Sequence, residues 1–198
     1  MEKKKITIIG AGMMGSALAF PAAENGHEVH IVGTCLDDKI IDGYLATGKH
    51  EKFCRPFPEN VNYHYFKDWK TVVEGSDFVI GGVSSFGVDW FLEEILIQLD
   101  PEMPVLSVTK GLRATDDGSL LSYPGYWMSE LAKRGIHRDI CAVGGPCTSY
   151  ELVFKDPTEV AFCGWDNEVL RMMKQAMQRP YYHISLTNDV IGDMVIRT

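Results

Sequence analysis

Short runs of apolar, β-branched residues alternate with stretches of helical periodicity along most of the chain. Such runs, bounded by glycine or proline, are typical of strands buried in a parallel sheet. The predicted strands cover residues 5–9, 27–33, 62–66, 77–83, 104–111, 139–146, 158–164 and 181–187. The predicted helices cover residues 16–25, part of 34–62, 86–99, 119–135 and 167–178, and a Pro-Gly pair interrupts the one at 119–135. This alternation predicts an α/β fold built on a doubly wound, mostly parallel sheet.

A glycine fingerprint, G-x-G-x-x-G, follows the first predicted strand at Gly10, Gly12 and Gly15. In a β-α-β unit the first glycine allows a tight turn, and the second lets the backbone approach a pyrophosphate. The third lets the helix pack close to the strand, and the pyrophosphate lies at the helix N-terminus, which favours an anion. We therefore predict a Rossmann-type dinucleotide-binding domain, with a purely structural glycine turn as the alternative.

The end of the second strand carries no acidic residue to bind the ribose 2′-hydroxyl of NAD. Gly33 and Thr34 occupy that tip, whereas Asp37 and Asp38 come later. A neutral tip does not repel the 2′-phosphate of NADP, but no arginine is present to attract one. The sequence leaves the choice between NAD and NADP open.

Two other strand ends carry candidate site residues, because ligands of open α/β sheets bind beyond the carboxyl ends of the strands. The small residues of Gly81–Ser85, including Val83 and Ser84, would let a cofactor lie against the backbone. The alternative is a plain turn in which a serine caps the next helix. Lys110, at the end of another strand, could donate a proton to a carbonyl oxygen or bind an anionic substrate group, or it could simply reach solvent.

The segment from Val143 to Leu152 predicts a tight turn at Gly144–Pro146, followed by a helix that begins around Cys147 to Ser149. A helix N-terminus can hold an anion or an amide. A thiol in that position could have a lowered pKa. Since no histidine lies near it in sequence, a nucleophilic role for Cys147 is not expected.

Charge and cysteine content narrow the classes of partner. The net charge is -8 and the pI is about 5.2, which argues against general binding to nucleic acid or to an anionic membrane. The five cysteines are scattered and include no C-x-x-C pair, which predicts reduced thiols in a cytoplasmic protein. The six histidines are scattered too, so no metal site is predicted.

Taken in order, these segments resemble the amino-terminal domain of NAD(P)-dependent glycerol-3-phosphate dehydrogenases. The matching segments are "ITIIGAGMMGSALA", "NGHEVHIVG", "VLSVTKGL", "GGPCTSYEL" with "PTEVAF", and "DVIG". The family interconverts dihydroxyacetone phosphate and sn-glycerol 3-phosphate, a step of carbohydrate and glycerophospholipid metabolism. The glycine fingerprint alone would not separate it from ketopantoate reductases.

The resemblance implies roles for individual residues. Met13 and Met14 would contact the dinucleotide through their backbones, and Lys110 would contact both cofactor and substrate. Gly145 and Cys147 would lie near the phosphorylated substrate, and Ser149 near the nicotinamide amide. Cys147 stands where the family commonly has serine, which weakens a hydroxyl hydrogen bond.

The resemblance also predicts the domain organisation. Residues 1–188 form the dinucleotide-binding domain, and residues 189–198 begin the connection to a helical substrate domain that the sequence does not include. The family's proton-donor lysine belongs to that helical domain and is expected beyond Thr198. We therefore expect the chain to bind dinucleotide with little turnover, as a domain of a longer protein.

Two alternative functions stay open for the chain. It could be a non-catalytic nucleotide-binding module, or part of a reductase of a 2-keto acid such as ketopantoate. Whether the full-length protein forms a homodimer is a separate open question.

Overall fold

A computed structural model describes residues 2–115 and 118–189 of the chain. Its strands are β1 Lys5–Ile9, β2 Glu28–Val32, β3 Val61–His64, β4 Phe78–Gly81, β5 Val105–Ser107, β6 Leu112–Ala114, β7 Leu120–Ser122, β8 Ile140–Gly144, β9 Thr158–Cys163 and β10 Tyr182–Thr187. Its α-helices are α1 Met13–Glu24, α2 Asp38–Thr47, α3 Trp69–Val73, α4 Val88–Phe91, α5 Tyr123–Lys133, α6 Ser149–Phe154 and α7 Asn167–Met177. A π-helical turn at Leu92–Leu96 continues α4.

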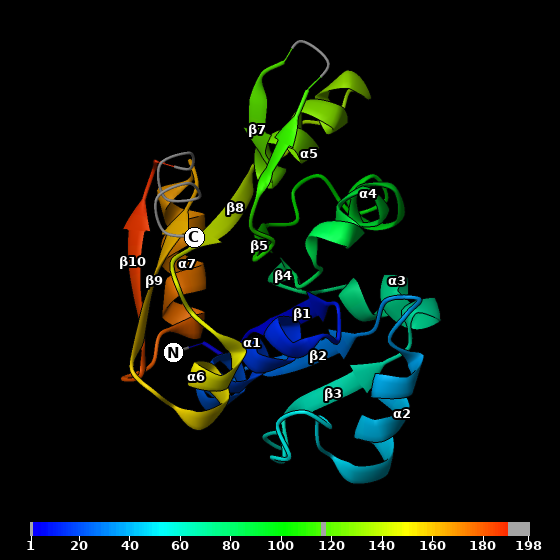
Figure 1. Ribbon diagram of the computed structural model, residues 1–198, viewed down its shortest axis with the longest axis vertical. Helices are drawn as coiled ribbons and strands as arrows, with labels where there is room; N and C mark the ends of the chain where they lie inside the picture. The colour runs from blue at the N-terminus through cyan, green and yellow to red at the C-terminus, as the bar shows by residue number, and fades with distance from the viewer. Residues whose placement is uncertain (1, 116–117, 190–198) are drawn as a thin grey trace.

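The strands form one eight-stranded sheet in the order β10-β9-β8-β5-β4-β1-β2-β3, beside a separate hairpin of β6 and β7 (Figure 1). Every neighbouring pair in the large sheet is parallel except β8 and β9, which are antiparallel. The predicted α/β class with a mostly parallel sheet is therefore confirmed. Strand order reverses between β1 and β4, and a ligand crevice is expected beyond the strand ends at such a switch point.

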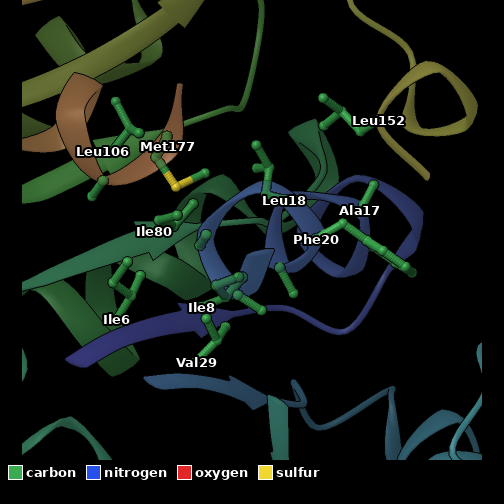
Figure 2. Packing of buried hydrophobic residues seen from close by; sticks show 14 of the residues in the cluster. Ile6, Ile8, Ala17, Leu18, Phe20, Val29, Ile80, Leu106, Leu152 and Met177 are labelled. Carbon is green, nitrogen blue, oxygen red and sulfur yellow. The ribbon is translucent and has the colours of Figure 1, made fainter. Parts of the chain in front are cut away.

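Helix α1 lies on one face of the sheet and is buried on all sides. Residues 15–23 are all buried, because the sheet packs beneath the helix while α6 and α7 cover it from above (Figure 2). The side chains that fill this layer are shown as sticks, among them Ile6, Ile8, Leu18, Val29, Ile80, Leu106, Leu152 and Met177. Pro21 lies inside α1, and the helix continues through it to Glu24.

The opposite face of the sheet carries α3, α4 and α5. Alternation along β1 sends Ile9 to this side, where it packs in a second cluster with Val79, Val105 and Trp127. The indole of Trp127 is fully buried, and its N–H donates to the carbonyl of Val88 at 2.8 Å. The sheet is therefore covered on both faces, as expected of a parallel sheet.

The prediction for residues 119–135 is wrong at its amino-terminal end. Residues Leu120–Ser122 form β7, which pairs antiparallel with β6. Pro124 and Gly125 lie in the first turn of α5 instead of interrupting a helix, and the Ser122 hydroxyl accepts from Gly125 N at 3.3 Å as the N-cap. Proline is tolerated in a first turn because its missing N–H has no partner there.

The predicted connection at residues 189–198 lies almost entirely outside the described residues, which end at Asp189. Thr198, beyond which the family's proton-donor lysine is expected, also lies outside them. The boundary between the two predicted domains and the position of that lysine therefore stay predictions. Among the residues described, no helix is both long enough and apolar enough to cross a membrane.

Candidate functional site

Three glycines pack against one another where β1 and β4 end. A Cβ on Gly15 would overlap the carbonyl oxygen of Gly10, and one on Gly82 would lie 2.9 Å from the Cα of Gly15. Gly10 has a φ of +113°, and a Cβ there would meet the Gly82 oxygen at 2.7 Å. The packing of α1 onto the sheet therefore requires Gly10, Gly15 and Gly82. Sequence analysis did not assign this role to Gly82.

Gly12 differs from these three. Its φ of -64° and ψ of 176° are open to any residue, and a Cβ there would meet nothing within 4 Å. Gly12 is the N-cap residue of α1, and no side-chain hydrogen bond caps the helix at this position. Neither the fold nor the backbone geometry requires a glycine at this position, and a side chain would project into open space.

That open space belongs to a groove made of two cavities, which have volumes of about 460 and about 310 Å³. Gly12, Gly82, Val83 and Ser84 line both of them. The larger cavity extends over Met13, Met14, Lys110, Gly145 and Cys147, and the smaller one over Gly10, Thr34, Asp37 and Phe86. The groove thus crosses the carboxyl ends of the strands at the switch point, with the start of α1 at its centre.

Lys110 is positioned by the residues on either side of it. The Thr109 hydroxyl donates to the carbonyl of Val83 at 2.8 Å, which ties the end of β5 to the end of β4. Gly111 has a φ of +133°, and a Cβ there would lie 2.6 Å from the Tyr123 ring. Only glycine fits that turn, so the segment Thr109–Gly111 points the intervening lysine into the larger cavity.

The Lys110 ammonium donates to the backbone carbonyl of Gly145. Burial lowers the pKa of Lys110, and the nearby Cys147 opposes that shift. Within the described part of the chain, Lys110 forms no ion pair with a carboxylate. A half-buried cation with only a carbonyl partner can still offer its charge to an anionic ligand.

The expected lowering of the Cys147 pKa is wrong. Burial raises the pKa of the Cys147 thiol to about 11, and Lys110 and a contact with Thr158 only partly oppose it. Helix α6 starts at Ser149, so the thiol lies before the helix instead of in its first turn. Cys147 is therefore a neutral thiol beside Lys110.

The start of α6 is occupied by its own capping box. The Glu151 carboxylate accepts from Thr148 N at 2.6 Å, and the Thr148 hydroxyl accepts from Glu151 N at 3.4 Å. These two N–H groups are already bonded, which explains the glutamate that follows the Gly145-Pro146 turn. The helix is six residues long, and the anion-binding edge expected at its N-terminus stays a prediction.

The prediction of a neutral tip at the end of β2 is also wrong. The Asp37 carboxylate turns back over that tip and accepts from Thr34 N and from Thr34 Oγ1, both at 2.8 Å. It also accepts from Ala11 N of the glycine loop at 3.1 Å. A carboxylate therefore lies between the ends of β1 and β2, although the carboxyl end of β2 itself carries none.

Two exposed apolar side chains line the smaller cavity and were not predicted. Phe86 is 99% exposed and Leu36 is 87% exposed, which is unusual for such large apolar groups. An aromatic residue directly after the small residues at the end of β4 is the sequence signal that could have identified Phe86. A flat apolar ligand would remove both side chains from water.

Three predicted site residues do not line either cavity. Gly15 is buried in the α1 packing, and a Cβ on Gly33 would contact Ile41 at 3.0 Å and Asp37 at 3.1 Å. Ser149 is the first residue of α6 and lies outside both linings. Among the described residues, no three histidine, cysteine or acidic side chains are grouped so that they could hold a metal ion.

Comparison with known proteins places this groove in context. Residues 5–170 match the family profile described as "NAD-dependent glycerol-3-phosphate dehydrogenase N-terminus". An NADP(+)-dependent glycerol-3-phosphate dehydrogenase of Archaeoglobus fulgidus is 30% identical over 187 residues, which are 94% of this chain and 54% of that protein. The chain thus spans about half the length of the curated relatives it matches.

Solved structures share the fold. A glycerol-3-phosphate dehydrogenase of Coxiella burnetii superposes with a TM-score of 0.81 at 22% identity, covering 96% of this chain and 55% of the other. One from Plasmodium falciparum gives a TM-score of 0.78 at 21% identity, covering 94% and 53%.

Proposed function

Because this chain belongs to the NAD-dependent glycerol-3-phosphate dehydrogenase family, we propose that its groove binds the dinucleotide of an oxidoreductase. In the complete protein that oxidoreductase interconverts dihydroxyacetone phosphate and sn-glycerol 3-phosphate. The substrate is a small phosphorylated molecule, and the cofactor is NAD or NADP.

The observation that carries the proposal is the presence of a glycine at position 12. Gly12 lines both cavities, yet neither backbone conformation nor packing demands a glycine there. A missing Cβ is explained when a ligand must approach the backbone at that point. The N–H groups at the start of α1, including those of Met13 and Met14, face an anion favourably, and the pyrophosphate is the anion that fits.

The two cavities suit the two halves of a dinucleotide. Leu36 and Phe86 offer apolar faces for the adenine ring, and Thr34 lies at the tip where the adenosine ribose belongs. The larger cavity, lined by Val83, Ser84 and Lys110, is left for the nicotinamide and the substrate. The role of Ser149 rests on the family resemblance, and that of Gly33 on its place at the end of β2, instead of on this lining.

The chemistry of the larger cavity centres on Lys110. When bound, the reduced nicotinamide supplies a hydride to the C2 carbonyl of dihydroxyacetone phosphate. Lys110 binds the anionic substrate and stabilises the charge that develops on the carbonyl oxygen. Gly145 holds the lysine, and Cys147 borders the substrate as a neutral group. The resemblance implies that the proton comes from a lysine of the family's helical domain, so the dinucleotide-binding domain by itself is expected to turn over little.

The binding proposal is tested by titrating the purified chain with NADH and with NADPH, following heat or nicotinamide fluorescence. Saturable binding of at least one is expected, and both should be lost in Gly12→Val. If neither binds, the groove is not a dinucleotide site. Binding that survives Gly12→Val unchanged would place the dinucleotide elsewhere.

The substrate proposal is tested on the complete gene product. We expect NAD(P)H oxidation with dihydroxyacetone phosphate and none with ketopantoate. Activity with ketopantoate alone would move the protein to the 2-keto-acid reductases. Dinucleotide binding without activity on either substrate would support a non-catalytic nucleotide-binding module.

A further inference from the structure

We propose that Asp37 makes this chain select NAD over NADP, because its carboxylate lies where the adenosine ribose of the proposed cofactor belongs. The inference rests on the proposed function and adds a specificity-determining residue to it. It departs from the relative of Archaeoglobus fulgidus, whose name describes it as NADP(+)-dependent.

The carboxylate is held in place by three donors. Asp37 Oδ2 accepts from Thr34 N and Thr34 Oγ1 at the end of β2, and from Ala11 N after the end of β1. These strands are parallel neighbours whose carboxyl ends point the same way, and α2 begins just beyond them (Figure 1). A side chain bonded to two strand ends cannot swing aside for a larger ligand without losing those bonds.

Helix capping does not account for this arrangement. Asp37 is the N-cap residue of α2, but its side chain makes no capping hydrogen bond to that helix. Instead the side chain points back to the glycine loop and lines the smaller cavity. Within the described residues no donor is bonded to Oδ1, so this oxygen can accept from a ribose hydroxyl.

The charge of the cavity favours a neutral ribose. Among the twelve described residues that line it, Asp37 is the only one with a formal charge. Lys39, the nearest cation along α2, lines a separate cavity with Thr47 and His50, which shares no residue with this one. A 2′-phosphate would therefore meet a fixed carboxylate with no arginine or lysine in the lining to compensate, whereas a 2′-hydroxyl would donate to it.

The test compares nucleotide affinities in matched variants. The unmodified chain and its Asp37→Asn and Asp38→Asn variants are each titrated with NADH and NADPH at one fixed, low ionic strength. Asp38 is the adjacent exposed carboxylate on α2 and does not line the cavity, so Asp38→Asn controls for the loss of one charge.

We expect the unmodified chain to prefer NADH by about 100-fold, the effect of one close charge pair in a partly solvated site. Asp37→Asn should weaken NADH binding about tenfold and bring the two affinities close together, and Asp38→Asn should change neither. Circular dichroism establishes that the variants are folded. If Asp37→Asn does not fold, the ratio of NADH to NADPH affinity in the unmodified chain decides whether the chain selects NAD.

The ways in which the proposal can fail are distinguishable. NADPH binding as tight as NADH binding in the unmodified chain would overturn the role of Asp37 and leave dinucleotide binding intact. An unchanged ratio of NADH to NADPH affinity in folded Asp37→Asn would likewise overturn the role of Asp37 and leave dinucleotide binding intact. Absence of binding by both nucleotides would overturn the proposed function, and the role of Asp37 with it.

Discussion

The side chain of Lys110 and the backbone carbonyl of Gly145 are joined by a hydrogen bond that links the segments following β5 and β8. Gly145 can accept it because its φ of +121° turns the chain sharply, and a Cβ there would press on Glu159 O and Val160 Cα at 3.1 Å. The partner of this half-buried lysine is thus a neutral dipole. Its positive charge remains uncompensated within the described residues, which suits a site that receives an anion.

Replacing Lys110 by methionine should therefore separate stability from activity. The lost hydrogen bond costs about 1 kcal/mol, and removal of a desolvated charge offsets it, so the free energy of unfolding should change by less than about 1 kcal/mol. In the complete protein, kcat/KM for dihydroxyacetone phosphate should fall by at least about 100-fold. Exposed Lys67→Met is the control and should change neither quantity. A Lys110→Met enzyme with near-normal kcat/KM would contradict the assigned role.

The raised pKa of Cys147 predicts slow alkylation. At mildly alkaline pH iodoacetamide should modify exposed Cys35 and Cys54 first, because Cys147 stays a thiol up to about pH 11. Peptide mass spectrometry over a time course measures the order. Labelling of Cys147 as fast as Cys54 would show that the thiol is activated.

The same shift predicts a pH dependence of stability. The folded state holds the Cys147 proton more tightly than the unfolded state, so this contribution is fully present below pH 9.0 and is lost as pH rises to about 11. Cys147→Ser lacks the titration, and its free energy of unfolding should fall less steeply over that interval. Urea denaturation at a series of pH values tests this, and parallel curves would contradict it.

Two glycines of the fingerprint should respond differently to alanine. Gly15→Ala drives a Cβ into the Gly10 oxygen and should cost at least about 2 kcal/mol of unfolding free energy. Gly12→Ala meets no protein atom and should cost only about 0.5 kcal/mol as an N-cap change. Its effect should appear in NADH affinity, which should drop at least about tenfold. Equal stability losses in the two variants would remove the argument that the ligand requires Gly12.

The capping box of α6 predicts a local stability effect. Thr148→Ala removes both the side-chain acceptor for Glu151 N and one bond to the Glu151 carboxylate, and should cost about 1 kcal/mol. Glu151→Gln keeps an oxygen acceptor for Thr148 N and should cost less. Urea midpoints with unchanged m-values check both. A larger loss in Glu151→Gln would mean that the carboxylate acts outside the cap.

The layers of the fold and the centre of the groove could be predicted because their signals are local. The run Lys5–Ile9 and the glycines at positions 10, 12 and 15 carry strand, turn and helix start within one short segment. The same holds for Thr109–Gly111, because the glycine that follows Lys110 directly after a buried strand marks the tight turn in the sequence itself. Met13, Met14, Gly145 and Cys147 came from resemblance, and they line the same cavity.

What could not be predicted depends on contacts between distant segments. Asp37 acts across the tips of two strands, and its bond to Ala11 N joins residues 26 positions apart. Position 82, after β4, must be glycine because the Cα of Gly15 in α1 packs against it. Strand β7 was predicted as helix and β6 was not predicted, because each strand has only three residues, too few for a period of two to stand out. The Cys147 pKa was mispredicted because burial outweighs the neighbouring cation.

The most direct measurement is a crystal structure of the chain grown with NADH. The account predicts the pyrophosphate over Gly12 within hydrogen-bonding distance of the first N–H groups of α1. The adenine should lie between Leu36 and Phe86, with its ribose at Asp37, and the nicotinamide in the cavity of Lys110. NADH bound away from Gly12, or bound with its two halves exchanged between the cavities, would contradict it.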